Sequence, residues 1–322
     1  MDVVRGLGDV LERPRALAIG MFDGVHVGHR AAITRAIDEA RARDLRSAVL
    51  TFERHPLSIV NPTAAPRLLT TLEERMRLIA DLGPDELVLL PFDVDMAAMS
   101  AERFCGEVLV AKLGARVVVV GENFSFGAGG TGDAAMLAAC GRVHGFETIV
   151  LRLMSERGQT ISSTRIRGLL ASGVIDEVRE ILGRPPSVAA RVQSGAGRGR
   201  ALGVPTANLE VTADAMRPGR GVYVARAYVD GAWYRAAVNI GRNPTFNGDA
   251  PLADITEAFL LGFEGDLYGH LLRLDFLAKI RDERRFADAA ALRVAMRRDI
   301  DVVARLDDAA FADVGLVPLP SS

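Results

Sequence analysis

Two histidines, His26 and His29, lie three residues apart at the end of the stretch Ala18-Ile-Gly-Met-Phe-Asp-Gly-Val-His-Val-Gly-His29. If a helix begins near His29, both imidazoles lie in its first turn and can reach the same anion. The free backbone N–H groups of that turn favour a phosphate at the same place. The pattern predicts a nucleotide site, although the histidines could instead cap the helix or pack against a sheet. A metal site is the poorer interpretation, because no third histidine or cysteine lies close in the sequence.

The elements that must position this turn alternate between apolar strands and amphipathic helices up to about residue 184. We expect strands at 16–21, 48–52, 86–91, 116–121 and 148–151, and helices at about 29–42, 71–82, 100–113 and 133–144. Thr71-Leu-Glu-Glu74 has the form of a capping box, and Ser100 is expected to cap the helix that Gly114 ends. The alternation predicts an α/β fold with a parallel, doubly wound sheet and ligand loops at the carboxyl ends of its strands.

Two further loops lie at predicted strand ends. Gly121-Glu-Asn-Phe-Ser-Phe-Gly127 follows the fourth strand, and Ile161-Ser-Ser-Thr-Arg-Ile-Arg167 follows the fifth strand and opens a helix. The hydroxyl groups of the second loop could simply cap that helix. Alternatively, Ser163, Thr164 and the helix N-terminus hold the phosphates of ATP while Arg167 neutralises their charge.

The sequence changes character after Leu182-Gly-Arg-Pro-Pro186, because two prolines bar a continuing helix. We therefore expect two domains, residues 1–184 and 185–322. The second contains short β-like runs separated by glycine turns, a hairpin signal at Asp230-Gly231, and helical periodicity from residue 286 to about 306. This pattern predicts a small barrel with a C-terminal helix.

The composition is that of an ordinary globular protein, with 49% hydrophobic and 25% charged residues among 322. A net charge of −2 gives no overall attraction to nucleic acid or to an anionic membrane. No apolar run approaches the ~20 residues that span a bilayer, and charged residues interrupt the N-terminus where a signal peptide would be apolar. Cys105 and Cys140 are expected to be reduced thiols in the core. We expect a cytoplasmic enzyme with neither a nucleic-acid nor a membrane partner.

The string from Gly20 to His29 resembles the signature of the nucleotidylyltransferases, and most closely that of the bacterial bifunctional riboflavin kinase/FMN adenylyltransferase (FAD synthetase) family. The loops at 121–127 and 161–167 match two further motifs of that family. In the second half, the stretches 197–208, 239–246, 266–269 and 281–286 are similar to its riboflavin kinase module. The resemblance covers roughly residues 16–306. It implies a Rossmann-like nucleotidylyltransferase domain followed by a small antiparallel β-barrel of the riboflavin kinase type with a terminal helix.

The resemblance implies two reactions, in which ATP phosphorylates riboflavin to FMN and a second ATP adenylates FMN to FAD with release of pyrophosphate. It implies catalytic roles for His26 and His29 in the first half and for Glu257, as general base, in the second. The implied ATP-binding residues are Gly20, Phe22, Asp23, Asn123, Ser163, Thr164, Arg167, Gly197, Gly203, Thr206 and Asn208. Thr206 and Asn208 would also bind Mg²⁺, and Phe126 would stack on the flavin. The expected small-molecule partners are riboflavin, FMN and ATP.

One departure from the family pattern leaves an alternative open. Gly262 stands where the family often has aspartate, so the chain could be an FMN adenylyltransferase only, with an impaired kinase module. A second alternative is a non-catalytic regulator that binds a flavin or a nucleotide.

Overall fold

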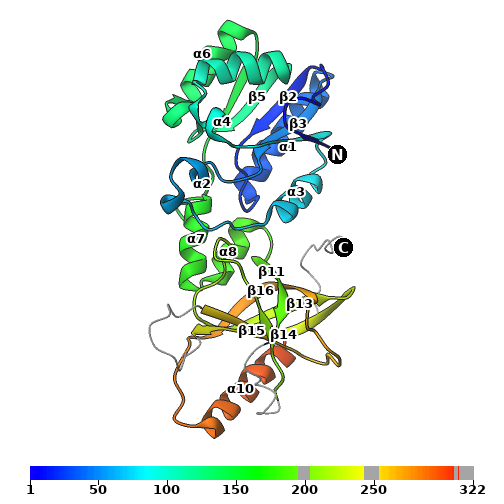
Figure 1. Ribbon diagram of the computed structural model, residues 1–322, viewed down its shortest axis with the longest axis vertical. Helices are drawn as coiled ribbons and strands as arrows, with labels where there is room; N and C mark the ends of the chain where they lie inside the picture. Colours follow the sequence, from blue (N-terminus) through cyan, green and yellow to red (C-terminus); the bar gives the residue numbers. More distant parts are fainter. Residues whose placement is uncertain (195–203, 243–253, 308–310, 312–322) are drawn as a thin grey trace. The chain divides into compact units, whose positions relative to one another are not determined.

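The computed structural model describes residues 1–194, 204–242, 254–307 and 311, and the chain divides into two compact units, Met1–Ser163 and Thr164–Ser322 (Figure 1). A six-stranded sheet forms the centre of the first unit, and every pair of neighbouring strands is parallel. This confirms the predicted parallel sheet. Its strands are β1 (Asp2–Arg5), β2 (Arg15–Ile19), β3 (Arg46–Phe52), β4 (Glu86–Leu90), β5 (Ala115–Gly121) and β8 (Glu147–Leu151).

The order of the strands, β1-β4-β3-β2-β5-β8, places a reversal of chain direction across the sheet between β2 and β5. From β2 the chain moves to β3 and β4 on one side, and β5 and β8 lie on the other side. Ligands of open α/β sheets bind outside the carboxyl ends of the strands at such a reversal. The loop with the two histidines follows β2 and the 121–127 loop follows β5, so both lie at this point.

Helices cover both faces of the sheet. The side chains of β2 alternate between the two faces, so β2 packs against helices on both sides. Ala16 and Ala18 pack with α1 (Val27–Ala42) and α3 (Leu72–Ala80), whereas Leu17 and Ile19 pack in a second cluster with α6 (Ala134–His144). The other helices between β1 and β8 are α2 (Leu57–Val60), α4 (Val94–Ala98), α5 (Ala101–Arg103), the 3-10 turns Pro62–Ala64 and Ala128–Gly130, and the π-helix η2 (Phe104–Lys112).

The predicted caps are present. The Thr71 hydroxyl accepts a hydrogen bond from the backbone N–H of Glu74 at 3.2 Å, and the Ser100 hydroxyl accepts one from that of Arg103 at 3.3 Å. The helix that Ser100 caps differs from the prediction, because after one α-helical turn it continues as the π-helix η2.

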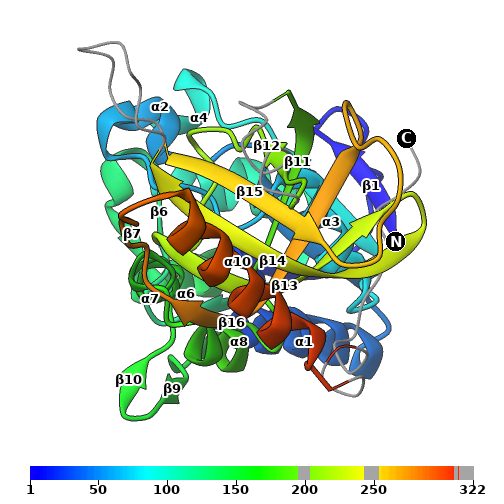
Figure 2. The ribbon, with the colours of Figure 1, turned by 90° about the horizontal axis from the view of Figure 1, so that it is seen from below.

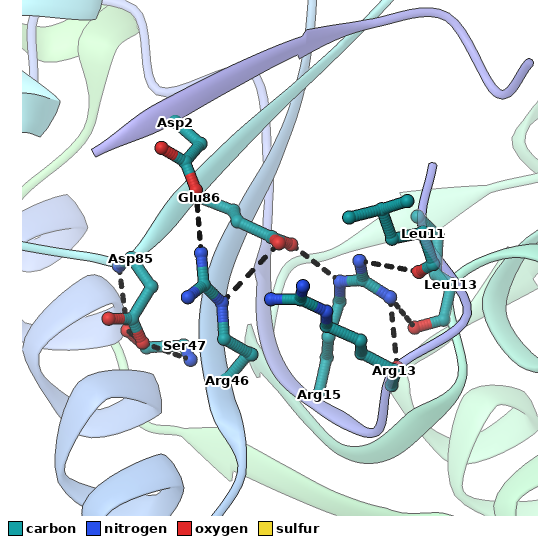
Figure 3. Close-up of polar contacts among 9 residues, drawn as sticks. All are labelled: Asp2, Leu11, Arg13, Arg15, Arg46, Ser47, Asp85, Glu86 and Leu113. Atoms are coloured by element: carbon teal, nitrogen blue, oxygen red, sulfur yellow. Dashed lines mark hydrogen bonds and ion pairs between the residues drawn. The ribbon is translucent and has the colours of Figure 1, made fainter. Parts of the chain in front are cut away.

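A buried ionic network lies at the amino ends of the strands, opposite the ends that the histidine loop follows (Figure 3). The Arg15 side chain is fully buried and donates from Nε to Glu86 Oε2 at 2.6 Å. Its two terminal nitrogens donate to the carbonyl oxygens of Leu11, Arg13 and Leu113. The network ties the starts of β2 and β4 to the segment before β2, so it serves the fold rather than the chemistry.

The second unit contains a closed antiparallel barrel in the order β11-β12-β15-β14-β13-β16, which confirms the predicted barrel. Its strands are β11 (Ser187–Gln193), β12 (Ala207–Leu209), β13 (Gly221–Val229), β14 (Ala232–Arg242), β15 (Asp254–Leu260) and β16 (Leu271–Arg281). The terminal helix α10 (Ala289–Ala304) lies along the outer face of the barrel (Figure 2), where its Val303 packs with Val224 and Leu277.

Helices α7 (Ser163–Ser172) and α8 (Ile175–Leu182) belong almost entirely to the second unit. Arg179 of α8 donates to the carbonyl oxygen of Leu277 in β16, and Gly219, before β13, donates to that of Leu170 in α7. The division into compact units therefore falls at residues 163/164, earlier in the chain than the boundary at 184/185 that the prolines suggested. The domain boundary at 184 stays a prediction. Two small hairpins, β6–β7 (Ser125–Phe126 with Gly132–Asp133) and β9–β10 (Ser155–Glu156 with Gln159–Thr160), complete the first unit.

Candidate active sites

The turn after β2 has a backbone that side chains rarely adopt. Phe22, Gly24 and Val25 have φ values of 51°, 85° and 39°, all in the left-handed region. Two of these three residues are not glycine, and both have buried side chains. A β-branched valine in this region is a true conformational outlier, which the surrounding structure must hold in place.

His26 is the N-cap of α1, which begins at Val27 rather than near His29. Its Nδ1 accepts a hydrogen bond from the backbone N–H of His29 at 3.2 Å. Because Nδ1 accepts, the neutral imidazole carries its proton on Nε2, which is thus a hydrogen-bond donor. The rings of His26 and His29 are stacked, with 3.5 Å between centroids and 18° between planes. A Cβ at Gly28 would lie 3.3 Å from the His26 ring, so glycine makes room for it.

His29 is held as a neutral imidazole. Burial, and secondarily the neighbouring His26, lower its pKa well below the ordinary value of 6.5. Its ring packs edge-on against Phe22, 5.3 Å between centroids. Among the described residues, its Nδ1 is buried without a hydrogen-bond partner. A neutral imidazole at a helix N-terminus can donate one hydrogen bond to an anion without adding a full charge.

Asp23 lies in the same turn, and its carboxylate faces the chain around residue 70. It accepts hydrogen bonds from the backbone N–H groups of Leu69 at 2.9 Å and Thr70 at 3.2 Å. The side chain is 2% exposed. The structure thus gives Asp23 a role in anchoring the turn, and its predicted contact with ATP stays a prediction.

The other two predicted loops follow β5 and β8, and the second of them contacts the histidine turn. The hydroxyl of Ser163 donates to the carbonyl oxygen of Asp23 at 3.0 Å, which brings together motifs 140 residues apart. Asn123 follows β5 directly after Glu122, whose carboxylate accepts from the backbone N–H of Leu153 at 2.8 Å. Thr164 and Arg167 follow Ser163 in α7 and fall in the second unit.

Phe126 is mainly a core residue. Its side chain is 8% exposed, and its ring lies against Phe104 and is stacked on Phe124 at 5.4 Å between centroids. Of these rings, Phe124 is the one that is only partly buried. Stacking of a flavin on Phe126 stays a prediction.

A row of three polar residues crosses the barrel. Glu257 of β15 pairs in register with Asn208 of β12 on one side and with Asn239 of β14 on the other. All three are half-buried, whereas the flanking Thr256 and Ala258 are buried. Residues directly opposite on neighbouring strands have Cβ atoms about 5 Å apart, so the carboxylate lies between two amides. Asn239 was not among the predicted site residues, although the stretch that it opens was noted as a motif.

A second carboxylate lies next to this row. A Cβ added at Gly241 would lie 2.4 Å from Glu283 Oε1 and 3.5 Å from Asn239 Nδ2, so glycine provides the space for the Glu283 carboxylate. Thr206 directly precedes β12 and is half-buried. Gly197 and Gly203, the predicted phosphate-loop glycines, lie outside the described residues.

These features define a class of two-part protein. Its first unit is an α/β unit of the nucleotide-binding type, in which a helix N-terminus that favours anions lies where the strand order reverses. Its second unit is a barrel on which a carboxylate lies between two amides. The FAD synthetase family model matches residues 10–165, and the riboflavin kinase family model matches residues 182–306.

Full-length relatives carry both parts. The bifunctional riboflavin kinase/FMN adenylyltransferase of Escherichia coli K12 is 36% identical over 93% of this chain and 96% of its own length. The protein of that description from Pseudomonas fluorescens is 35% identical over the same shares. The chain belongs to the bifunctional riboflavin kinase/FMN adenylyltransferase family, as the motifs predicted.

A crystal structure described as a macrolide-efflux protein from Streptococcus pneumoniae has the same fold. It superposes with a TM-score of 0.84 at 28% identity and covers 95% of this chain and all of that chain. In the part of the chain that the structure describes, no helix has the length and apolar character needed to cross a membrane.

Proposed function

We propose that the second unit phosphorylates riboflavin to FMN with ATP and that the first unit adenylates FMN to FAD with a second ATP. The observation that carries the proposal is that one chain holds both arrangements, a histidine pair on a helix N-terminus and a carboxylate between two amides. The substrates are small molecules, without a nucleic-acid or membrane partner. We place the enzyme in the cytoplasm, in keeping with the free, buried state of Cys105 and Cys140.

Adenylyl transfer needs alignment more than a protein nucleophile, because an FMN phosphate oxygen attacks the α-phosphate of ATP and pyrophosphate leaves. In the proposed mechanism, the Nε2–H of His26 and the imidazole of His29 donate hydrogen bonds to phosphate oxygens. The N-terminus of α1 adds a favourable potential for negative charge. The proposed ATP contacts are completed by Gly20, Phe22, Asn123, Ser163, Thr164 and Arg167.

Phosphorylation of riboflavin needs a group that takes the proton of the attacking 5′-hydroxyl. Glu257 is the proposed general base, and its amide neighbours Asn208 and Asn239 can hold the carboxylate in one orientation by hydrogen bonding. Thr206 and Asn208, with Gly197 and Gly203, are the proposed contacts to the phosphates of ATP.

Mg²⁺ fits the chemistry of this row. Thr206 and Asn208 supply hydroxyl and amide oxygens, which are hard ligands suited to an ion that keeps several waters and binds through substrate phosphates. Among the described residues, no three His, Cys, Asp or Glu side chains cluster as a metal site. When bound, the ion would offset the negative charge of the transferred phosphoryl group.

Gly262, the feature behind the adenylyltransferase-only alternative, has a backbone reason to be glycine. It follows β15 in a turn with φ of 73°, a region that glycine occupies without strain.

Product analysis tests the proposal. The full chain is incubated with ATP, Mg²⁺ and either riboflavin or FMN, and the flavins are separated by chromatography. We expect FMN and then FAD from riboflavin, and FAD with pyrophosphate from FMN. FAD from FMN without FMN from riboflavin would support the adenylyltransferase-only alternative. Flavin or nucleotide binding without any product would support the regulator.

A further inference from the structure

The turn that holds the histidines is braced by a segment that contains none of the predicted site residues. Residues 69–75 comprise the three residues before α3 and the first turn of that helix, more than forty residues beyond His26. We propose that Arg75 in this segment is a positioning residue for adenylyl transfer, which fixes the histidine turn to the neighbouring strand end. This inference rests on the proposed function of the first unit.

The guanidinium of Arg75 joins the carboxyl ends of two neighbouring strands. Nη1 donates to the carbonyl oxygen of Met21, two residues after β2, at 3.0 Å. Nη2 donates to the carbonyl oxygens of Phe52 at 2.6 Å and Glu53 at 3.3 Å, at the end of β3. Arg75 itself is 3% exposed. A buried cation that donates to carbonyl groups of both strand ends sets the distance between the two loops that leave them.

The segment 69–75 also forms hydrogen bonds with the turn at a second point. The Asp23 carboxylate accepts from the backbone N–H groups of Leu69 and Thr70, and the Thr70 hydroxyl accepts from the N–H of Gly24 at 3.2 Å. Thr70 is 5% exposed, so these contacts lie out of water. Residues 69–75 therefore hold Met21, Asp23 and Gly24, which are three of the five residues between Gly20 and His26.

The turn requires such restraint because its backbone is strained. Phe22 and Val25 lie in the left-handed region, where a residue with a Cβ persists only if its surroundings over-determine the conformation. One end of the strained stretch is fixed by the start of α1. The other end is fixed at the Met21 carbonyl oxygen, which accepts from Arg75 at 3.0 Å and from the Thr51 hydroxyl at 3.1 Å. Loss of the guanidinium removes the contact between this carbonyl and α3, so the turn can relax and the imidazoles of His26 and His29 can move.

Arginine is suited to this task in a way that lysine is not. Its planar fork presents donors to acceptors on two strands at once, whereas an ammonium is a single centre. The carbonyl oxygens of Met21, Phe52 and Glu53 accept from the fork of Arg75, and Nη1 also contacts the Met21 sulfur at 3.5 Å. Burial lowers the pKa of Arg75, and the nearby carboxylates of Asp23 and Glu73 oppose this shift. The geometry of the fork determines which two strand ends the side chain joins. Lysine at this position could bond to one strand end and would restore the brace only in part.

The test compares Arg75→Met, Arg75→Lys and the matched control Arg77→Met in the full-length protein. Arg77 lies on the same helix, and its ion pairs with Glu74 and Asp81 stay within α3 and its C-cap. For each variant, kcat and KM of FAD formation are measured from FMN and ATP, with FMN formation from riboflavin as the internal control. Thermal melting gives the temperature at which each variant begins to unfold, and all assays are run below the lowest of these temperatures.

We expect Arg75→Met to lower kcat for FAD formation about 100-fold, the effect of an ångström-scale misplacement of reacting groups. KM for FMN and ATP should change less than threefold, and FMN formation should be unchanged. Arg75→Lys should recover part of kcat, and Arg77→Met should match the wild type. A loss of stability alone would not produce this division between kcat and KM in folded protein.

Wild-type kcat for FAD formation in folded Arg75→Met would overturn the inference. If Arg75→Met does not fold, Arg75→Lys decides, and wild-type kcat in that variant overturns the inference in the same way. A rise in KM without a change in kcat would also overturn it, because it would assign Arg75 to substrate affinity rather than alignment. Failure of the wild type to form FAD would instead refute the proposed function.

Discussion

His26 has two roles that substitution can separate. Its Nδ1 caps α1 by accepting from the backbone N–H of His29 at 3.2 Å, and its Nε2–H is the donor in the proposed adenylyl transfer. Asparagine can replace the first role, because its side-chain oxygen is among the best N-cap acceptors, but it does not place an imidazole N–H. Alanine replaces neither role.

The two variants should differ in stability and agree in activity. His26→Ala loses the cap, worth about 1 kcal/mol, and should lower the Tm of the first unit by about 2–4 °C. His26→Asn should melt within about 1 °C of the wild type. Both should form FAD from FMN about 100–1000-fold more slowly, the usual loss for one hydrogen-bond donor to a charge that develops in the transition state.

The assay measures melting of the full chain and the initial rate of FAD formation, with FMN formation from riboflavin as the control for intact protein. Both variants should keep the control activity, because His26 is in the first unit and the proposed kinase is in the second. A wild-type rate of FAD formation in His26→Asn would refute the catalytic role of the imidazole. Equal melting of His26→Ala and the wild type would refute the value of the cap.

Three further predictions follow from the buried and paired groups. Because burial lowers the pKa of His29 in the folded state, the unfolded chain binds more protons below pH 6.5, so stability should fall as the pH drops from 6.5, by at most about 1.4 kcal/mol per pH unit. Urea unfolding at pH 7.5, 6 and 5 should show a shallower fall in His29→Gln, and identical pH slopes would contradict this. Glu257→Gln should lower the rate of FMN formation about 100–10,000-fold and spare FAD formation from FMN; loss of both activities in folded protein would show that Glu257 is not a kinase-specific base. Arg15→Met should cost about 3–5 kcal/mol of unfolding free energy, because Glu86 stays buried without its closest partner. The double variant with Glu86→Met should recover part of this loss in urea unfolding, and no recovery would argue that the carbonyl contacts of Arg15 carry the effect.

Features set by local sequence could be predicted. The five predicted strands of the sheet are short runs of mostly apolar residues, and the caps at Thr71 and Ser100 depend on residues within one helical turn. The edge strand β1 was not predicted, because its four residues are mostly exposed and have no buried apolar run. The π-helix η2 could not be distinguished from an α-helix, since both place apolar residues from one stretch against the same sheet.

The sites divide in the same way. The pairing of His26 with His29 follows from a spacing of three residues, and the sequence indicated it. The position of Asn239 beside Glu257 depends on strand register across the barrel, which no local pattern fixes. The anchoring of Asp23 depends on Leu69 and Thr70, which lie 46 and 47 residues further along the chain, so no local pattern could indicate it.

The strained turn shows why positioning residues are harder to predict than catalytic ones. Ordinary preference would place glycine wherever φ is positive, yet Phe22 and Val25 adopt this conformation with buried side chains. The sequence therefore contains no sign of the strain, and the contact that supports it comes from Arg75, 54 residues after Met21. A residue that acts on substrate needs a particular chemical group, which the sequence reveals, whereas a residue that holds a backbone carbonyl needs only the right place. For this chain, the motif thus indicates what the histidines could do, and the fold indicates what keeps them where they can do it.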